Sequence, residues 1–311
     1  MLQDVLRNSA LVVGSIVAGV IGASAAGAFR GGAGLIQPSI FDASSLVAAI
    51  GAIVVASVSA MVIGILVGRF SNPAVGLFVA GWAFFGLAWR MGAMDTFIIG
   101  GGSVRGLAIE TVIWAVVGGV TAAAVIRGAG ELPDVEPTVD GSRPSPFASV
   151  AAIRFAAACV AALPVAWIVS RTPVVGQALG AAVVAGVGAG LAARLASPHI
   201  QPYLLVPAVV LVGAVALVVA EVRLGADAEA FVRMYGVPSP GPVHGLMWVA
   251  GGMIGGSMGL GWARGFLEHE DDPQKDAAPR PMVRRAAAYT PSAPAADLAG
   301  TDGRPGGETG A

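Results

Sequence analysis

Residues 44–68 read SSLVAAIGAIVVASVSAMVIGILVG, a run of twenty-five positions that contains no charged side chain. The hydrocarbon core of a bilayer is about 30 Å thick, and an α-helix rises about 1.5 Å per residue. Roughly 20 consecutive apolar residues are therefore enough for a helix to cross the bilayer. The run predicts a transmembrane helix.

Seven other segments resemble this run in length and composition. They are residues 9–29, 73–90, 106–126, 150–170, 174–196, 203–223 and 242–264. Pro164 is expected to kink the fifth of the eight runs, because proline cannot donate a backbone hydrogen bond. The sequence predicts an all-α integral membrane protein with about eight transmembrane helices. Seven or six helices are the alternatives, since 73–90 is short and 242–264 is rich in glycine.

The composition supports a membrane protein and excludes several other classes. Among 311 residues, 56% are hydrophobic and 12% are charged, whereas soluble domains carry about 25% charged residues. The formal net charge is −1, so nothing points to a nucleic-acid partner. Cys159 is the only cysteine, which excludes a disulfide within the chain. Three scattered histidines do not suggest a metal site, and we expect no metal and no cofactor.

The first apolar run also has features of a secretory signal. Arg7 precedes it, and the small residues Ala23, Ser24 and Ala25 resemble a cleavage site. The apolar run is longer than the usual 7–15 residues of a signal. We therefore favour an uncleaved first helix over removal of residues 1–28.

Lysine and arginine are somewhat more frequent on the side of the predicted helices that holds both chain termini. The positive-inside rule then favours cytoplasmic termini. The abundance of Ala, Gly and Arg is typical of a bacterial, GC-rich coding sequence, so we expect a multi-pass protein of the bacterial inner (cell) membrane.

Two segments differ in composition from the apolar runs. Residues 127–149 are acidic and proline-rich, and are expected to form a flexible cytoplasmic linker. Residues 265–311 contain few large apolar side chains and are expected to be a disordered cytoplasmic tail that recruits a protein partner. Residues 1–126 and 150–264 are then two four-helix membrane regions.

The two membrane regions show signs of an internal repeat. AIGAIVVASVSA (49–60) matches ALGAAVVAGVGA (178–189) at eight of twelve positions. Further along, Phe97 precedes Trp114 by 17 residues, and Phe231 precedes Trp248 by the same number. Two four-helix units in tandem have parallel topology, which places a pseudo-two-fold axis along the membrane normal.

In the register of the two tryptophans, Glu110 is equivalent to His244. Ionisable residues inside a membrane usually face the bundle interior and mark a substrate or proton route. Glu110 and His244 are therefore our candidates for a substrate or proton pathway. The alternative is that both lie close to the headgroups, with Trp114 and Trp248 as interfacial anchors.

Glycine recurs at four-residue intervals in the last run. The five positions are Gly251, Gly252, Gly255, Gly256 and Gly259. Small residues at this spacing let membrane helices approach closely. We expect a helix-packing seam rather than a pore or hinge, and a homo-oligomer or membrane complex is compatible with such surfaces.

Enzymatic motifs are weak in this sequence. Ser257 lies among glycines, as in an intramembrane serine hydrolase, but His244 is 13 residues ahead of it in the same run. No catalytic residue is assigned. The sequence leads to the hypothesis of a small-solute or proton-coupled permease with a site between the repeats. The alternative is a non-catalytic membrane scaffold or assembly subunit that recruits partners through its tail.

Overall fold

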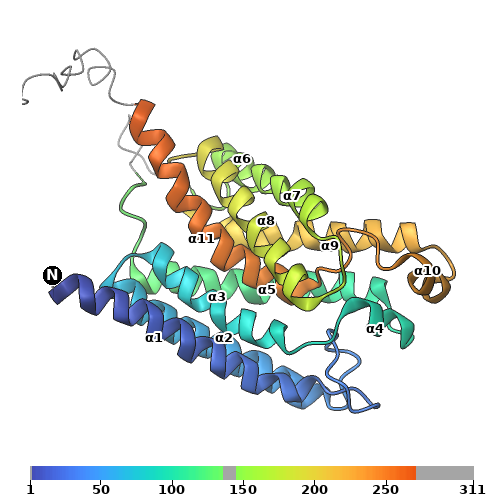
Figure 1. The fold of residues 1–311 in the computed structure, drawn as a ribbon. Helices are drawn as coiled ribbons and strands as arrows, with labels where there is room; N and C mark the ends of the chain where they lie inside the picture. Colours follow the sequence, from blue (N-terminus) through green and yellow to red (C-terminus); the bar gives the residue numbers. More distant parts are fainter. Residues whose placement is uncertain (1, 136–144, 271–311) are drawn as a thin grey trace, which may run out of the picture. The chain divides into compact units, whose positions relative to one another are not determined.

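The computed structural model describes residues 2–135 and 145–270, and Figure 1 traces their helices in sequence order. Regular structure in these ranges is helical, with one isolated antiparallel bridge between Arg30 and Ile36. The α-helices are α1 (Leu2–Ala25), α2 (Leu46–Phe70), α3 (Pro73–Trp89), α4 (Met94–Ile99), α5 (Val104–Ala129), α6 (Val150–Ala158), α7 (Ala162–Val169), α8 (Val175–Ala196), α9 (Leu205–Leu224), α10 (Ala228–Tyr235) and α11 (Gly245–Glu270). The 3-10 turns are η1 (Ala26–Phe29), η2 (Cys159–Ala161) and η3 (Pro202–Leu204).

Six helical segments of the described chain are long and apolar enough to cross a bilayer. They make this a multi-pass membrane protein whose apolar helices contact lipid. Two of the eight expected spans are not among the six. Helix α3 has only 17 residues, and α11 has 26 residues but is rich in glycine, which lowers its hydropathy.

Small uncharged polar side chains cap four of the helices, and Asp227 caps α10 in the same way. Ser45 caps α2, Asn72 caps α3, Ser103 caps α5 and Ser149 caps α6, each by accepting a hydrogen bond from the backbone N–H three residues later. The first N–H groups of a helix have no partner within it, so these caps fix where each helix starts.

The fifth predicted span is interrupted. Residues 150–169 form α6, η2 and α7 instead of one continuous helix. Pro164 lies in the first turn of α7, where its ring conflicts with the carbonyl four residues earlier, at Val160. Val160 lies inside η2, so the break occurs where the proline disfavours α-helical geometry.

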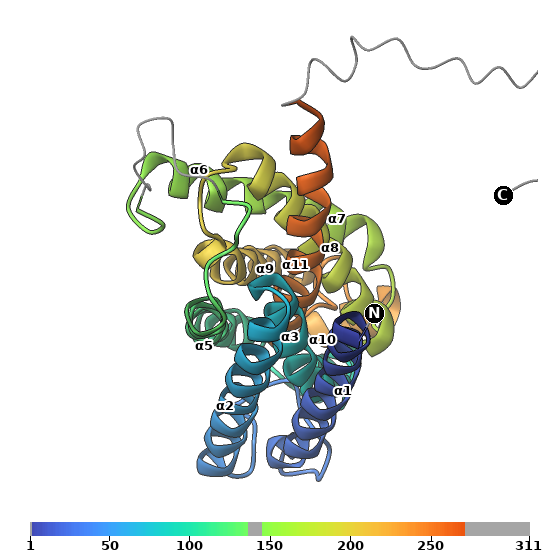
Figure 2. The same cartoon turned by 90° about the vertical axis from the view of Figure 1, so that its left-hand side faces the viewer.

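The helices pack as a bundle whose centre contains α3, α5, α9 and α11. Helix α3 contacts α1, α2 and α11, and α11 also contacts α8 and α9 (Figure 2). Helix α5 packs on α9 and α2. The two short helices α4 and α10 contact each other.

Glycine lets α11 approach α8 at backbone distance. A Cβ atom added at Gly255 would lie 1.9 Å from the carbonyl oxygen of Val183, and one at Gly251 would lie 2.3 Å from that of Ala182. Gly259 faces α8 in the same way, whereas Gly252 and Gly256 face the side chains of α9. No larger residue fits the α8 side of this seam without displacing a helix.

The segment after α5 is held against α8 and α9. Leu132 exchanges two hydrogen bonds with the side-chain amide of Gln201, at 3.1 and 3.3 Å. Arg194, which is 2% exposed, forms a 3.0 Å ion pair with Asp134. Residues 130–135 are thus fixed by specific contacts, which differs from the flexible linker that we expected to begin at residue 127. Residues 136–144 of that linker and residues 271–311 of the tail lie outside the described residues.

The connections between helices gather at two ends of the bundle. We call one end the loop side; it holds residues 30–45, 90–103 and 225–244. The other end, the linker side, holds residues 71–72 and 197–204. In Figure 1, α4 and α10 mark the loop side, and the N-terminus lies at the opposite end.

Candidate functional site

Glu110 lies in the second turn of α5, and its side chain is 1% exposed. Its carboxylate accepts three hydrogen bonds from the α1–α2 loop. The donors are Ser39 Oγ at 2.5 Å, the backbone N–H of Ile40 at 2.7 Å and the backbone N–H of Phe41 at 3.3 Å. Burial of a carboxylate is costly unless hydrogen bonds replace water. Glu110 is thus enclosed beneath residues 39–41 rather than open to the headgroups.

A hydrogen-bond path leads from Glu110 to a polar pocket. Ser39 Oγ accepts a hydrogen bond from the backbone N–H of Asp42 at 3.2 Å. Asp42 and Gln37 line a pocket of about 210 Å³ on the loop side, together with Phe97 and the glycine-rich backbone of residues 31–33 and 100–102. The pocket therefore offers carboxylate, amide and peptide groups to a small polar molecule.

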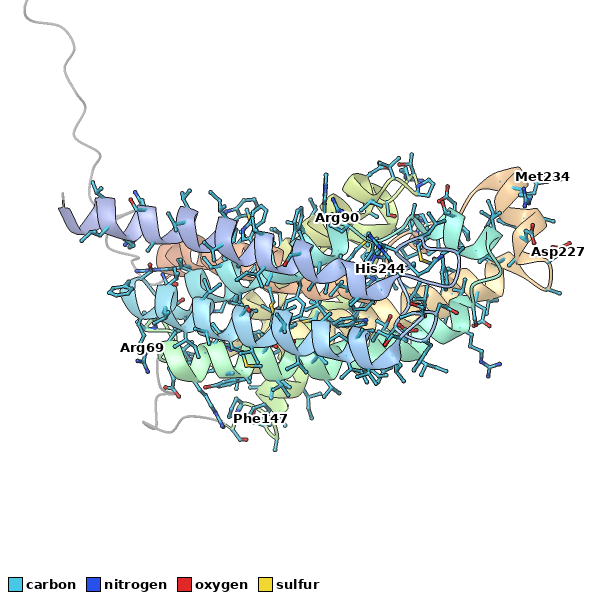
Figure 3. The ribbon with its side chains drawn as sticks, turned by 90° about the horizontal axis from the view of Figure 1, so that it is seen from below. Arg69, Arg90, Phe147, Asp227, Met234 and His244 are labelled. Atoms are coloured by element: carbon cyan, nitrogen blue, oxygen red, sulfur yellow. The ribbon has the colours of Figure 1, made fainter. Side chains whose placement is uncertain are left out.

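His244 precedes α11 and is fully buried (Figure 3). Neither of its ring nitrogens has a hydrogen-bond partner in the described part of the chain. The adjacent Gly245 packs on α5, because a Cβ added there would lie 2.6 Å from Thr111 Oγ1 and 2.9 Å from Trp114 Cδ1. The fold thus brings the start of α11 against the residue that follows Glu110. The carboxylate of Glu110 nevertheless bonds the loop and not the imidazole.

The two tryptophans differ from the expected interfacial position. Trp114 is 2% exposed and Trp248 is fully buried, so neither side chain faces lipid headgroups. Trp248 Nε1 donates a 3.1 Å hydrogen bond to the carbonyl of Val243, and its ring covers Gly213 of α9. The sequence pattern of a tryptophan near a span end was misleading, because these rings fill the seams where glycine leaves space.

Ser257 is buried in α11, and its hydroxyl donates a 2.8 Å hydrogen bond to the carbonyl of Ile254 in the same helix. Since the ring nitrogens of His244 have no partner among the described residues, the two side chains do not form a hydrogen-bonded dyad. Among the side chains that the structure describes, no three from His, Cys, Asp or Glu come together as a metal site would require.

The loop residues that hold Glu110 were not anticipated from the sequence. Ser39 precedes Glu110 by 71 positions, and a single sequence offers no signal that pairs them. The run RGGAG at residues 30–34 indicates only a turn. The signal that could have drawn attention to the loop is the polar cluster of Gln37, Ser39 and Asp42 between two apolar helices.

Comparison of this chain with known protein families, with curated proteins and with solved structures finds no match. The chemistry of the Glu110 and His244 region is therefore the basis on which a function can be assigned.

Proposed function

We propose that this protein is a small-solute permease coupled to protons, with its pathway between two four-helix parallel repeats. The observation that carries the proposal is the buried carboxylate of Glu110, which holds the α1–α2 loop, and other residues of that loop line the polar pocket. Glu110 is the titratable element, and the loop is the gate. The protein resides in the cell membrane, with both termini in the cytoplasm.

The helix order supports the repeat. Helices α2, α3, α4 and α5 are followed in the second half by α8, α9, α10 and α11, with short helices in equivalent places. The contacts are reciprocal, since α5 packs on α9 and α11 packs on α3, while α4 meets α10 and α5 meets α11. A two-fold axis would relate contacts in this way. Parallel repeats place the axis along the membrane normal, with a pathway at the interface of the halves.

Two four-helix repeats require eight spans, so α3 and α11 would cross the membrane in addition to the six long apolar segments. Helix α3 is about 26 Å long at 1.5 Å per residue, and α11 is about 39 Å long. The low hydropathy of α11 is compatible with a membrane position, because five of its glycines, Gly251, Gly252, Gly255, Gly256 and Gly259, face α8 and α9 instead of lipid.

The gate follows from the hydrogen-bonding capacity of a carboxyl group. An ionised carboxylate is an acceptor on both oxygens, which suits the hydroxyl and two N–H donors of residues 39–41. Protonation removes the negative charge and turns one oxygen into a donor, which weakens the hydrogen bonds that the carboxyl group accepts from the N–H groups of Ile40 and Phe41. A proton that reaches Glu110 therefore loosens its hold on the loop.

His244 is the second titratable group of the proposed pathway. Its unpartnered ring nitrogens lie at the start of α11, where that helix meets Thr111 of α5. A neutral imidazole can accept a proton at one nitrogen and donate from the other. Opening of the loop would give water access to this position and complete a proton route.

The test is chemical labelling of a cysteine placed below the loop. The variant is Thr111→Cys in a Cys159→Ala background, reconstituted in vesicles and exposed to an impermeant maleimide. We expect labelling to be slow at neutral pH and faster as pH falls. Adding Glu110→Gln replaces one acceptor with a donor, so the cysteine at position 111 should then be labelled quickly at every pH.

The matched control is Glu229→Gln, since Glu229 is an exposed acid whose ion pair among the described residues is with Arg233 on α10. This variant should retain the pH-dependent labelling. Slow labelling that is indifferent to pH and to Glu110→Gln would contradict the gate.

The alternative function is a non-catalytic scaffold or assembly subunit. It is favoured by the full set of hydrogen bonds at Glu110, which is also what a purely structural acid requires. In that case the chain would work through partners of residues 271–311, which lie outside the described residues. Loss of a partner complex on removal of that tail, with no gated labelling, would support the scaffold.

A further inference from the structure

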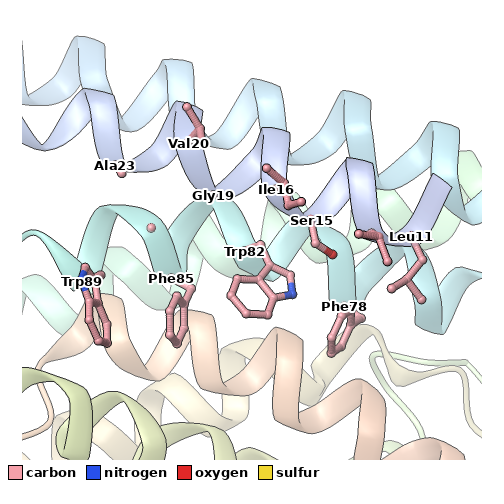
Figure 4. A pocket seen from close by; sticks show the side chains of 12 residues that line it. Leu11, Ser15, Ile16, Gly19, Val20, Ala23, Phe78, Trp82, Phe85 and Trp89 are labelled. Atoms are coloured by element: carbon pink, nitrogen blue, oxygen red, sulfur yellow. The ribbon is translucent and has the colours of Figure 1, made fainter. Parts of the chain in front are cut away.

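Helices α1 and α3 enclose an apolar groove of about 780 Å³ (Figure 4). Both helices belong to the membrane region, and the groove follows them toward the loop side. Its walls are formed by aliphatic side chains of α1 and aromatic side chains of α3, among them Ile16, Val20, Ala23, Trp82, Phe85 and Trp89.

The groove has a rigid shape because its floor is backbone and its wall is aromatic. A Cβ added at Gly86 would lie 2.0 Å from the carbonyl oxygen of Gly19, so α1 and α3 touch without side chains between them. Along α3, the rings of Trp82 and Phe85 lie 4.9 Å apart, and those of Phe85 and Trp89 lie 6.0 Å apart. Rings in contact hold one another in place. The groove is therefore preformed for an extended apolar chain.

Two arginines lie at the loop-side end of the groove. Arg90 directly follows Trp89, and Arg30 follows the 3-10 turn that extends α1. The backbone of Arg30 pairs with Ile36, whose carbonyl accepts a hydrogen bond from Gly92 at 3.0 Å, so the two arginines belong to one corner of the loop side. Both side chains are exposed, and neither forms an ion pair with a described residue.

We propose that the groove binds one anionic phospholipid, with an acyl chain along the aromatic wall and the phosphate between Arg30 and Arg90. Apart from the hydroxyl of Ser15 and the indole N–H of Trp82, the walls are apolar, which favours an acyl chain over a polar ligand at the depth of the spans. Guanidinium groups bind phosphate through paired hydrogen bonds, and each basic residue at a membrane surface favours anionic lipid. This site is separate from Glu110 and does not depend on the proposed transport function.

The test uses the fluorescence of the groove tryptophans in phosphatidylcholine vesicles. A small fraction of lipid is replaced by dibrominated phosphatidylglycerol or by dibrominated phosphatidylcholine, and quenching is compared. The fluorescence of the Trp82→Phe/Trp89→Phe variant is subtracted from that of the unaltered chain, which leaves the fluorescence of the two groove tryptophans. We expect dibrominated phosphatidylglycerol to quench this fluorescence at least roughly fivefold more efficiently than dibrominated phosphatidylcholine. One arginine at the membrane surface favours an anionic lipid by about that factor.

The variant Arg30→Gln/Arg90→Gln should remove the preference for the anionic lipid. Arg105→Gln/Arg233→Gln is the matched control, since these arginines are exposed on the loop side but follow no groove residue. It should retain the preference. Ala23→Phe, which fills the groove, should reduce quenching by both lipids.

Two results would overturn the proposal. Equal quenching by the two lipids in the unaltered chain would mean that the groove takes up bulk lipid without selection. Absence of quenching by either lipid, together with crosslinked dimers, would mean that a second copy of the chain covers the groove.

Discussion

Glu110 is held from outside its own helix, by a loop that lies about 70 positions earlier in the chain. The sequence placed this acid within a predicted span, in a register that makes it equivalent to His244, and left open whether it is buried or close to the headgroups. It did not indicate Ser39 or the N–H groups of Ile40 and Phe41, because hydrogen bonds across such a separation leave no local pattern. The two candidate residues could thus be named from the sequence, but the loop contacts of Glu110 could not.

Replacement of Glu110 should destabilise the protein. Glu110→Gln leaves a loop N–H group facing another donor, and bonds to a buried charged group contribute about 1.5–3 kcal/mol each. We expect a loss of about 3 kcal/mol in the free energy of unfolding, measured by denaturation in mild detergent. Glu229→Gln, at an exposed ion pair, should change it by less than about 0.5 kcal/mol. A loss at position 110 as small as at 229 would show that the bonds from the loop to Glu110 contribute nothing.

His244 gives the opposite prediction for stability. Its two ring nitrogens are buried without a partner, and such groups cost about 1–3 kcal/mol. His244→Phe keeps the ring volume and removes both nitrogens, so the free energy of unfolding should stay unchanged or rise by about 1 kcal/mol. The same unfolding assay measures it. A loss of more than about 2 kcal/mol would mean that the imidazole has a structural partner.

At the scale of the helix, most boundaries followed from the sequence. The long apolar runs became helices, four of which start at a Ser or Asn cap, and Pro164 lies just after the break between α6 and α7. The short helices α4 and α10 were missed, since eight or fewer residues give little periodic signal. Trp114 and Trp248 are buried between helices, which the sequence did not indicate, because burial depends on which helices meet, and that is not a local property.

The close contact between α8 and α11 predicts that replacing two different glycines of α11 with alanine has very different effects on stability. Gly255→Ala places a methyl group 1.9 Å from a backbone oxygen of α8, which should cost at least about 2 kcal/mol. Gly261→Ala has open space around it and should be neutral or stabilising, because alanine favours helix over glycine by about 1 kcal/mol. Thermal unfolding of both variants is the measurement. Equal effects would contradict the close contact of the two helices.

The ion pair of Arg194 and Asp134 fixes the segment after α5 to α8. Asp134→Ala leaves a guanidinium that is 2% exposed without its carboxylate, and such a loss typically costs about 3–5 kcal/mol. The double variant Arg194→Met/Asp134→Ala should recover part of that loss. A double-mutant cycle in chemical unfolding measures the coupling, and strictly additive effects would show that the pair is not formed.

At the scale of the whole molecule, composition alone established the membrane class, and the structure supports six spans by length and apolar character. The proposed total of eight rests on α3 and α11, whose ends should lie on opposite faces of the membrane. Cysteines in a Cys159→Ala background at Arg90 and at Ser71 should react with an impermeant reagent from opposite sides. Reaction of both from the same side would mean that α3 does not cross.

The central claim is that Glu110 holds the α1–α2 loop, which lines the pocket, and that protonation loosens this hold; a distance across the loop side tests it most directly. Spin labels would be placed at Leu35 in the loop and at Met234 on α10, which are 56% and 70% exposed, in the Cys159→Ala background. We predict one narrow distance distribution at neutral pH and a broader, longer one at low pH or in Glu110→Gln. The same narrow distribution in all three conditions would contradict this claim and leave Glu110 as a structural residue.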